Sequence, residues 1–252
     1  MVEKRKLLFE AQQCYRTIRI YLPPFYQISQ EHYPVIYMFD GQYLFDDAKI
    51  SEHVMCLDNF LDKYDQSFIV IGIDSPDESS CRLAEYCPYD VENSHYQMIH
   101  GYGQTLMEFI VHTVKPYIDT HYRTLLLREY TMIGGFSMGG LMALYAAISY
   151  HTYFSKAACL SSSIGICLEA LKDEINQHDL LKDTRLFLSW GSEESRNKRA
   201  LAYASMNQLD ISHLLNLKGV QTYPYLLVNG RHHMISWQQQ IPLFMDYLWK
   251  SK

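Results

Sequence analysis

The chain contains 252 residues, of which 48% are hydrophobic and 20% are charged, and it carries a formal net charge of −6. This length predicts one large α/β domain over residues 1–252, because no linker rich in Pro, Gly or Ser divides the chain. Acidic and basic residues are interspersed, so we expect neither a nucleic-acid partner nor a membrane partner. No apolar stretch approaches the roughly 20 residues needed to span a bilayer.

The N-terminal residues and the cysteines carry signals about location and redox state. The charged start is not followed by the sustained apolar segment of a signal peptide, so we expect a cytoplasmic location. The six cysteines show neither a C-x-x-C pair nor a paired histidine spacing, which argues against a zinc site or a disulfide scaffold. We therefore expect no metal and no cofactor, and we expect most cysteines to be reduced and buried.

Nearly continuous β-prone runs alternate with helical segments along the chain. Strands are predicted at residues 17–22, 33–39, 67–74, 130–133, 157–160, 185–190 and 223–228. Helical spacing marks residues 104–122, with a kink or restart near Pro116, and a last helix is predicted at residues 237–249. Continuous hydrophobicity indicates strands that are covered on both faces. The pattern therefore predicts a doubly wound, mostly parallel α/β sheet with helices on both faces and right-handed crossovers.

Residues 134–140 read Gly-Gly-Phe-Ser-Met-Gly-Gly and place Ser137 in a G-x-S-x-G motif between a predicted strand and a helix. A serine on such a tight turn takes strained backbone angles, and Gly135 and Gly139 remove side chains that would collide with neighbouring elements. Ser137 is therefore a candidate nucleophile. The competing interpretation is a glycine-rich helix entry with an N-cap serine. Neither phosphate-binding glycine motif can be written onto these residues.

A serine nucleophile needs a base, and in α/β-hydrolases the acid follows a later strand in the chain. Glu193 and Glu194 both lie just beyond the strand predicted at residues 185–190. We favour Glu194, because its spacing from Gly191 lets the loop turn before the carboxylate is presented. The other glutamate would then lie in the first turn of a helix.

The histidine of such a site is expected near the C-terminus. His232 and His233 follow the strand predicted at residues 223–228. A loop histidine at the carboxyl end of a strand is well placed for catalysis, and we choose His232 as the base. His233 is then a neighbour that shapes the loop.

An oxyanion that develops during acyl transfer needs backbone N–H donors. One expected donor is Met138, which follows the candidate nucleophile at the start of its helix. The second is expected after the strand at residues 33–39, where Gly41 permits a tight turn and the Gln42 amide could point into the site. An ordinary turn is the competing interpretation.

Several further motifs occur in a fixed order along nearly the whole chain. They are Val-Ile-Tyr-Met-Phe-Asp-Gly-Gln-Tyr-Leu-Phe at 35–45, Arg-Leu-Ala-Glu-Tyr-Cys-Pro-Tyr at 82–89, Val-Lys-Pro-Tyr-Ile-Asp at 114–119, Tyr-Arg-Thr at 122–124, residues 134–141, and Gly-Arg-His at 230–232 with Trp237. With these motifs the chain resembles the esterase family of α/β-hydrolases. That family includes enterochelin esterases, S-formylglutathione hydrolases, feruloyl and acetyl-xylan esterases, and mycolyltransferases.

The resemblance implies an α/β-hydrolase fold with a Ser137, Glu194 and His232 triad, and it implies Met138 and Gln42 as the oxyanion-hole amides. A small-molecule ester or thioester is the implied substrate, cleaved through an acyl-enzyme. Acyl transfer to an alcohol is one alternative. A non-catalytic protein that binds a ligand through the same cleft is another, because fold does not imply function.

The resemblance also bears on the surroundings of the site. Family members carry a tryptophan five residues after the catalytic histidine, as Trp237 stands here. The chain departs from the family at residues 151–152, which read His-Thr where relatives often have Pro-Glu, and at Arg231, where glycine is common. Arg231 could narrow the cleft or contact an anionic acyl group.

Residues 75–103 are expected to form part of the cleft wall or a cap. The segment contains Tyr86, Tyr89, Tyr96 and His100, and its tyrosines could equally be packing residues. The candidate substrate-binding residues are Gly41, Tyr86, Arg231 and Trp237. The sequence leaves a homodimer open and does not identify the acyl or the alcohol part of the substrate.

Overall fold

The computed structural model describes residues 1–46, 53–93 and 97–250. Eight of the described strands form one sheet in the order β1-β2-β4-β3-β7-β8-β9-β10, and β5 and β6 form a separate hairpin. The strands of the sheet are β1 (Val2–Phe9), β2 (Cys14–Tyr21), β3 (Val35–Phe39), β4 (Ile69–Ile73), β7 (Thr131–Phe136), β8 (Lys156–Leu160), β9 (Arg185–Gly191) and β10 (Gln221–Leu227). The hairpin strands are β5 (Val91–Asn93) and β6 (Gln97–Ile99).

The central sheet is mostly parallel, as the continuous apolar runs predict. From β4 to β10 every neighbouring pair is parallel, whereas β1 with β2 and β2 with β4 are antiparallel. Each strand predicted from the sequence is present, with ends shifted by a few residues. Only β1 of this sheet was not predicted, because its largely exposed residues carry four charges and lack the apolar run of a covered strand.

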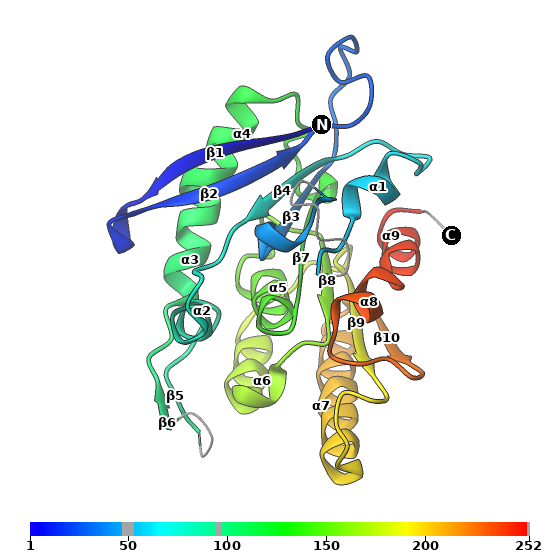
Figure 1. Ribbon diagram of the computed structural model, residues 1–252. Helices are drawn as coiled ribbons and strands as arrows, with labels where there is room; N and C mark the ends of the chain where they lie inside the picture. The colour runs from blue at the N-terminus through cyan, green and yellow to red at the C-terminus, as the bar shows by residue number, and fades with distance from the viewer. Residues whose placement is uncertain (47–52, 94–96, 251–252) are drawn as a thin grey trace.

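Helices cover both faces of the sheet (Figure 1). The α-helices are α1 (Leu57–Leu61), α2 (Ser79–Glu85), α3 (Gly103–Phe109), α4 (Lys115–His121), α5 (Met138–Ser149), α6 (Leu168–Gln177), α7 (Lys198–Leu217), α8 (Met234–Gln238) and α9 (Ile241–Trp249). The short 3₁₀ segments are η1 (Glu10–Gln12), η2 (Gly41–Tyr43), η5 (Arg128–Tyr130) and η6 (Ile164–Ile166).

The sheet separates the core into two clusters, one on each of its faces. In β3, Tyr37 and Phe39 belong to the cluster under α3 to α7, whereas Ile36 and Met38 belong to the cluster under α1, α8 and α9. Successive strand side chains point to opposite faces, so a strand covered on both faces must be apolar throughout. The confirmed architecture is thus the doubly wound α/β arrangement with helices on both faces.

The predicted helix at residues 104–122 is a continuous helical run with an irregular centre. A π-helical turn, η4 (Ile110–Val114), joins α3 to α4 just before Pro116. Proline cannot donate to the carbonyl four residues earlier, and a widened turn accommodates this missing bond. The disturbance predicted near Pro116 is therefore present, as a π-helical turn.

Two sequence predictions were wrong in detail. The last helix does not begin at residue 237: α8 ends at Gln238 and α9 begins at Ile241, with Pro242 in its first turn, where the missing N–H has no helical partner in any case. Half of the cysteines are buried rather than most, because Cys81 faces solvent and Cys14 and Cys56 are only partly covered. The cysteines form no disulfide.

Among the described helices, none combines the length and the apolar character needed to cross a membrane.

The loops that carry the candidate catalytic residues lie at one edge of the sheet. Ser137 follows β7, and Glu194 and His232 follow β9 and β10 in sequence. Because β7 to β10 are parallel, their carboxyl ends meet at one edge and bring these loops together.

Candidate active site

Ser137 lies on a strained turn between β7 and α5. Its backbone angles are φ 59° and ψ −122°, a conformation that a residue with a side chain rarely adopts. Its N–H donates to the Leu160 carbonyl at 2.9 Å, and its carbonyl accepts from Leu141 at 3.1 Å and from Ser163 at 3.2 Å. These backbone bonds hold the strained turn, as expected where strain serves a site.

The two glycines of the motif have the packing role that the sequence predicts. A Cβ on Gly135 would lie 2.6 Å from the Gly139 backbone in the first turn of α5. A Cβ on Gly139 would lie 3.0 Å from the Phe39 Cβ and 3.1 Å from an Asp40 carboxylate oxygen. Any larger residue at position 135 would therefore push α5 away from β7, and with it the serine.

His232 lies between Ser137 and Glu194. Its Nε2 is 2.9 Å from the Ser137 Oγ, and its Nδ1 is 3.1 Å from the Glu194 Oε2. An ionised carboxylate only accepts, so Nδ1–H donates to Glu194 and Nε2 is left to accept the serine proton. The structure thus brings together the three residues that the sequence singles out for acyl-transfer chemistry.

The Glu194 carboxylate is held in an ionised state by its partners. Besides His232, it accepts from the Ser161 hydroxyl at 2.6 Å and from the Gly191 amide at 2.7 Å. Burial opposes its ionisation, but the hydrogen bonds from His232, Ser161 and Gly191 outweigh burial and keep the pKa of Glu194 below its ordinary value. A negative Glu194 can orient a neutral imidazole and stabilise its protonated form.

Glu193, the competing glutamate, points elsewhere. Its Oε2 forms an exposed ion pair with the Arg231 Nε at 3.0 Å, and both side chains are largely in solvent. Arg231 lines a separate polar cavity of about 410 Å³ together with Glu193, Ser195 and others. Arg231 does not line either of the two cavities at His232. His233 caps α8, because its Nδ1 accepts from the Ile235 amide at 3.4 Å.

Trp237 lines the site and also contacts residues that support it. Its indole N–H donates to the Ser161 hydroxyl at 2.8 Å, and its ring stacks on Phe136 with centroids 4.3 Å apart. The same ring meets His232 edge-on at 5.2 Å. A continuous chain of contacts therefore runs from Trp237 through Ser161 and Glu194 to His232.

Ser161 was missed in the sequence. It follows β8 in the left-handed conformation, with φ 47°, and is almost fully buried. The signal that could have found it is positional, because a polar Ser-Ser-Ser run follows the apolar strand at the same carboxyl edge as Ser137. Its donor and acceptor contacts fix the second carboxylate oxygen of Glu194.

The two predicted oxyanion donors occupy the first turns of helices. Met138 is the first residue of α5, and Gln42 is the second residue of η2, so neither amide can reach a carbonyl within its own helix. The side chain of Gln42 is bonded to Ser75, donating to its hydroxyl at 2.7 Å and accepting from its amide at 3.0 Å. These two bonds fix the Gln42 side chain beside its backbone amide.

Two adjoining cavities share His232 and Trp237 in their lining, and Ser137 lines the first of them. One, of about 310 Å³, is lined by Tyr43, Ser75, Pro76, Asp77, Ser79, Arg82, Phe136, Ser137, His232 and Trp237. The other, of about 420 Å³, is lined by Tyr43, His53, Phe136, His232, His233, Met234 and Trp237. The first contains the charged side chains of Asp77 and Arg82, and the second is rich in aromatic and histidine side chains. An ester bound at Ser137 could place its two parts on the two sides.

Two of the predicted substrate-binding residues are packing residues. Tyr86 is fully buried, with its ring edge-on to Phe39 at 5.3 Å and its hydroxyl accepting from the Asp40 amide at 3.0 Å. Gly41 is buried against β4, where an added Cβ would lie 2.6 Å from the Gly72 backbone. Both therefore shape the turn that carries Gln42 and do not line the cavities.

Among the described residues of the predicted cap segment, only those in its first part line the site. Residues from 75 to 82 line the first cavity, whereas the β5–β6 hairpin lies at the periphery of the molecule (Figure 1). Tyr89 packs edge-on against Tyr145 at 5.7 Å, and the exposed His100 lies 3.5 Å from Asp90. Tyr96 lies outside the described residues. The tyrosines that can be placed are thus packing residues.

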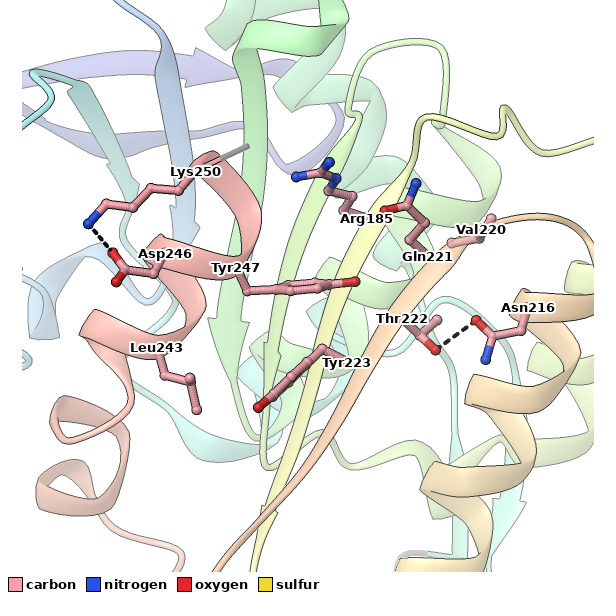
Figure 2. A pocket seen from close by; sticks show the side chains of 10 residues that line it. All are labelled: Arg185, Asn216, Val220, Gln221, Thr222, Tyr223, Leu243, Asp246, Tyr247 and Lys250. Carbon is pink, nitrogen blue, oxygen red and sulfur yellow. Dashed lines mark hydrogen bonds and ion pairs between the residues drawn. The ribbon is translucent and has the colours of Figure 1, made fainter. Parts of the chain in front are cut away.

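A larger cavity, of about 700 Å³, lies between α7, β10 and α9 (Figure 2). The rings of Tyr223 and Tyr247 pack against each other in its lining with centroids 5.0 Å apart, and Lys250 is paired with Asp246 at 2.9 Å. None of the residues that the sequence singles out for chemistry lines this cavity. This cavity is therefore separate from the candidate active site.

Comparisons with known proteins bear on the fold and the family. Over 190 residues the chain is 27% identical to the uncharacterized protein YbbA of Bacillus subtilis, covering 74% of this chain and 72% of YbbA. An IroE-like serine hydrolase from Shewanella oneidensis superposes with a TM-score of 0.76 at 22% identity, covering 98% of this chain and 81% of that chain. The siderophore hydrolase EstB from Aspergillus nidulans gives a TM-score of 0.73 at 19% identity, covering 99% and 96%.

These structural likenesses establish an α/β-hydrolase type of fold. The family model described as Putative esterase matches residues 10–245, which is most of the chain. The protein therefore belongs to this esterase family of hydrolases.

Proposed function

We propose that this protein is a serine esterase that cleaves a carboxylic ester of a small molecule through an acyl-enzyme on Ser137. The observation that carries the proposal is the pair of contacts at His232, 2.9 Å to the Ser137 Oγ and 3.1 Å to the Glu194 Oε2, beside an open cavity. Nucleophile, base and orienting acid in hydrogen-bond reach are the requirement for acyl transfer.

In the first step, the Ser137 Oγ bonds to the ester carbonyl carbon while its proton passes to the His232 Nε2. The carbonyl oxygen becomes an oxyanion, which the backbone amides of Met138 and Gln42 stabilise. When the intermediate collapses, the bond to the alcohol oxygen breaks and that oxygen takes the proton from His232. The products of this step are the free alcohol and the acyl-Ser137 ester.

In the second step, water replaces the alcohol. His232 removes a proton as the water oxygen attacks the acyl carbon, and it then returns the proton to the Ser137 Oγ. Glu194 stabilises the imidazolium that forms in each step, without becoming protonated itself. The second product is the carboxylic acid.

The two cavities suggest how a substrate is accommodated, and they define a substrate panel. The panel contains short acyl esters, aryl esters such as feruloyl esters, S-formylglutathione and a siderophore lactone. The lactone is included because the structurally similar EstB is a siderophore hydrolase. Rates across this panel would identify the acyl and alcohol parts that fit.

The decisive variant is Ser137→Ala, which removes the nucleophile and leaves the turn in place. We expect kcat on the best substrate to fall by at least about 10⁴-fold, because water attack without the serine is slow. Ser163→Ala is the matched control, since it removes a neighbouring hydroxyl while keeping the backbone N–H that donates to Ser137. The measurement is ester hydrolysis together with labelling by a fluorophosphonate probe.

The outcomes separate the competing functions. Hydrolysis by Ser137→Ala at the rate of the unmodified protein would remove Ser137 from the mechanism. If the unmodified protein neither labels nor turns over any ester, a binding function is favoured. New esters formed in the presence of added alcohols would identify acyl transfer in place of hydrolysis.

A further inference from the structure

The proposed mechanism does not use one charged pair at the edge of the site, between Asp40 and Arg82. Asp40 follows β3 and is fully buried, and the Arg82 side chain, from α2, is 22% exposed. Arg82 binds both carboxylate oxygens, through Nε at 2.7 Å and through Nη2 at 2.6 Å. This two-point contact is the arrangement in which an arginine fixes both the position and the plane of a carboxylate.

Asp40 begins the turn that carries the Gln42 amide. Its backbone is in the left-handed conformation, with φ 58°, and it precedes the first residue of η2. An aspartate adopts this conformation only when its surroundings hold it, even though it tolerates it better than most residues. The direction of the Gln42 N–H therefore depends on what holds Asp40.

Residues 75–86 hold this turn at three points. Arg82 binds the Asp40 carboxylate, and the Tyr86 hydroxyl accepts from the Asp40 amide at 3.0 Å. Ser75 binds both ends of the Gln42 side-chain amide. The Arg82 guanidinium also lies over the Tyr86 ring, 4.8 Å from its centroid. The turn is thus fixed at its carboxylate, at its amide and at its side chain.

The same carboxylate lies against the start of α5. A Cβ on Gly139 would be 3.1 Å from the Asp40 Oδ2, so the carboxylate is close to the residue that follows Met138. A negative charge is favourable at the N-terminus of a helix. Asp40 therefore lies between the two predicted oxyanion donors, beginning the turn of one and contacting the helix of the other.

A buried ion pair is weak evidence for stability, because removing two charges from water costs about as much as their attraction returns. Such a pair does, however, fix the positions of the groups that it joins. Stabilisation of a transition state depends on hydrogen-bond donors that are held in place before the reaction. The Arg82 side chain lines the cavity at Ser137, but its Nε and Nη2 groups donate to the Asp40 carboxylate. The guanidinium contacts this carboxylate and the ring of Tyr86.

We propose that Asp40 and Arg82 form a positioning pair, which holds the turn at residues 40–43 so that the Gln42 amide can donate to the oxyanion. This inference rests on the proposed function, because it concerns the same acyl-transfer site. The pair touches no reacting atom. Its effect should therefore appear in kcat, where transition-state contacts are felt, and leave KM nearly unchanged.

The test is a double-mutant cycle of Asp40→Asn, Arg82→Gln and the double variant, with Arg82→Lys as the conservative variant. We expect each single variant to lower kcat about 10- to 100-fold with KM within about threefold, because a displaced donor loses part of the stabilisation of one oxyanion-hole bond. The kcat of the double variant should be no lower than that of the more impaired single variant, because both substitutions disrupt the same ion pair. Arg82→Lys should recover only part of kcat, because it keeps the charge but not the two-point contact.

The matched control is Arg16→Lys. Arg16 forms the same two-point buried contact, 2.7 and 2.6 Å, with Glu85 at the C-terminal end of α2, and it also donates to the Asp74 carbonyl at 2.7 Å. If loss of kcat merely followed loosening of α2, Arg16→Lys would lose as much as Arg82→Lys at a similar fall in thermal unfolding temperature. We expect Arg16→Lys to keep kcat within about threefold at that same fall.

The possible outcomes are distinct. A raised KM with unchanged kcat in Arg82→Gln would make Arg82 a substrate contact and overturn the positioning role. Additive losses in the double variant, or equal losses in Arg16→Lys and Arg82→Lys, would overturn it as well. Ser137→Ala is run in the same assay. If Ser137→Ala is inactive and Arg82→Lys is fully active, the positioning role is wrong but the proposed function stands. If Ser137→Ala is active, the proposed function itself is wrong.

Discussion

Two adjacent glutamates show how strongly a residue's surroundings determine its chemistry. Glu193 and Glu194 share one loop, yet Glu193 pairs with Arg231 in solvent and Glu194 accepts from His232, Ser161 and Gly191. The hydrogen bonds to Glu194 overcome its burial and lower its pKa. The loop therefore presents one glutamate to the site and one to water.

At this scale we expect Glu194→Gln to reduce kcat by about 10³- to 10⁴-fold, because the imidazole loses its orienting charge. The change should also alter the pH dependence of stability. A lowered folded-state pKa contributes stability that is fully present above the ordinary value of 4.5 and is lost as pH falls through the folded-state value. The difference in unfolding free energy between the unmodified protein and Glu194→Gln should therefore shrink as pH falls below 4.5. Denaturant unfolding at several pH values measures it.

Glu193→Gln is the control for both readouts. It removes an exposed pair, which in general contributes little to stability, and it leaves the contacts of His232 intact. Equal losses of activity in the two variants, or a larger loss for Glu193→Gln, would transfer the acid role. A stability difference for Glu194→Gln that stayed constant down to pH 3 would contradict the linkage.

At the scale of elements, the loop after β9 and the loop after β10 are packed backbone to backbone. The Glu193 amide donates to the Gly230 carbonyl at 2.8 Å, and the Ser192 amide donates to the Leu227 carbonyl at 2.9 Å. A Cβ on Gly191 would lie 2.3 Å from the Gly230 oxygen. The distance between the acid and the base is therefore set by a contact that only glycine permits at position 191.

We expect Gly191→Ala to force the two loops apart and to move His232 relative to Glu194. Misplacement of about 1 Å can cost about 100-fold in rate, so kcat should fall at least about tenfold. The strain of the overlap should also lower the free energy of unfolding by about 1–3 kcal/mol. Steady-state kinetics and denaturant unfolding measure the two effects.

Gly165→Ala is the matched control, because a Cβ there would meet only the Asn207 side-chain nitrogen at 3.7 Å. It should leave kcat and stability nearly unchanged. Unaltered activity in Gly191→Ala would show that the loops can separate without disturbing the site.

For the whole molecule, the sheet has unequal coverings on its two faces. One face packs under α3 to α7, whereas the other is covered by α1, α8 and α9, which have 5, 5 and 9 residues. Phe244 of α9 is 1% exposed and lies 6.2 Å from the ring of Phe187 on β9. The thinner cover follows directly in the chain from the loop of His232, so its packing bears on the site as well as on stability.

We therefore expect Phe244→Ala to lower the free energy of unfolding by about 3–5 kcal/mol, through lost burial and the cavity left behind. Ile235→Ala is the control, because Ile235 is 50% exposed and should change stability by only about 0.5 kcal/mol. Equal effects in denaturant unfolding would show that α9 contributes little to the core.

Much of this arrangement could be predicted from local sequence. The strands from β2 to β10 in the main sheet were predicted because a strand covered on both faces must be apolar along its length. The elbow was predicted because its glycines remove collisions that any side chain would make. The exposed β1 and the break between α8 and α9 were not predicted, since neither produces a distinct local pattern.

The sequence by itself determined the fold class, the nucleophile candidate and the chain order of serine, acid and histidine, because these depend on periodicity and on short motifs. Only the tertiary structure decided which glutamate faces His232, that Tyr86 is a buried support, and that Ser161, Asp40 and Arg82 surround the site. These are contacts between residues about 33 to 46 positions apart. Such contacts arise when parallel strands bring their carboxyl ends to one edge, and no local pattern specifies which side chains then meet.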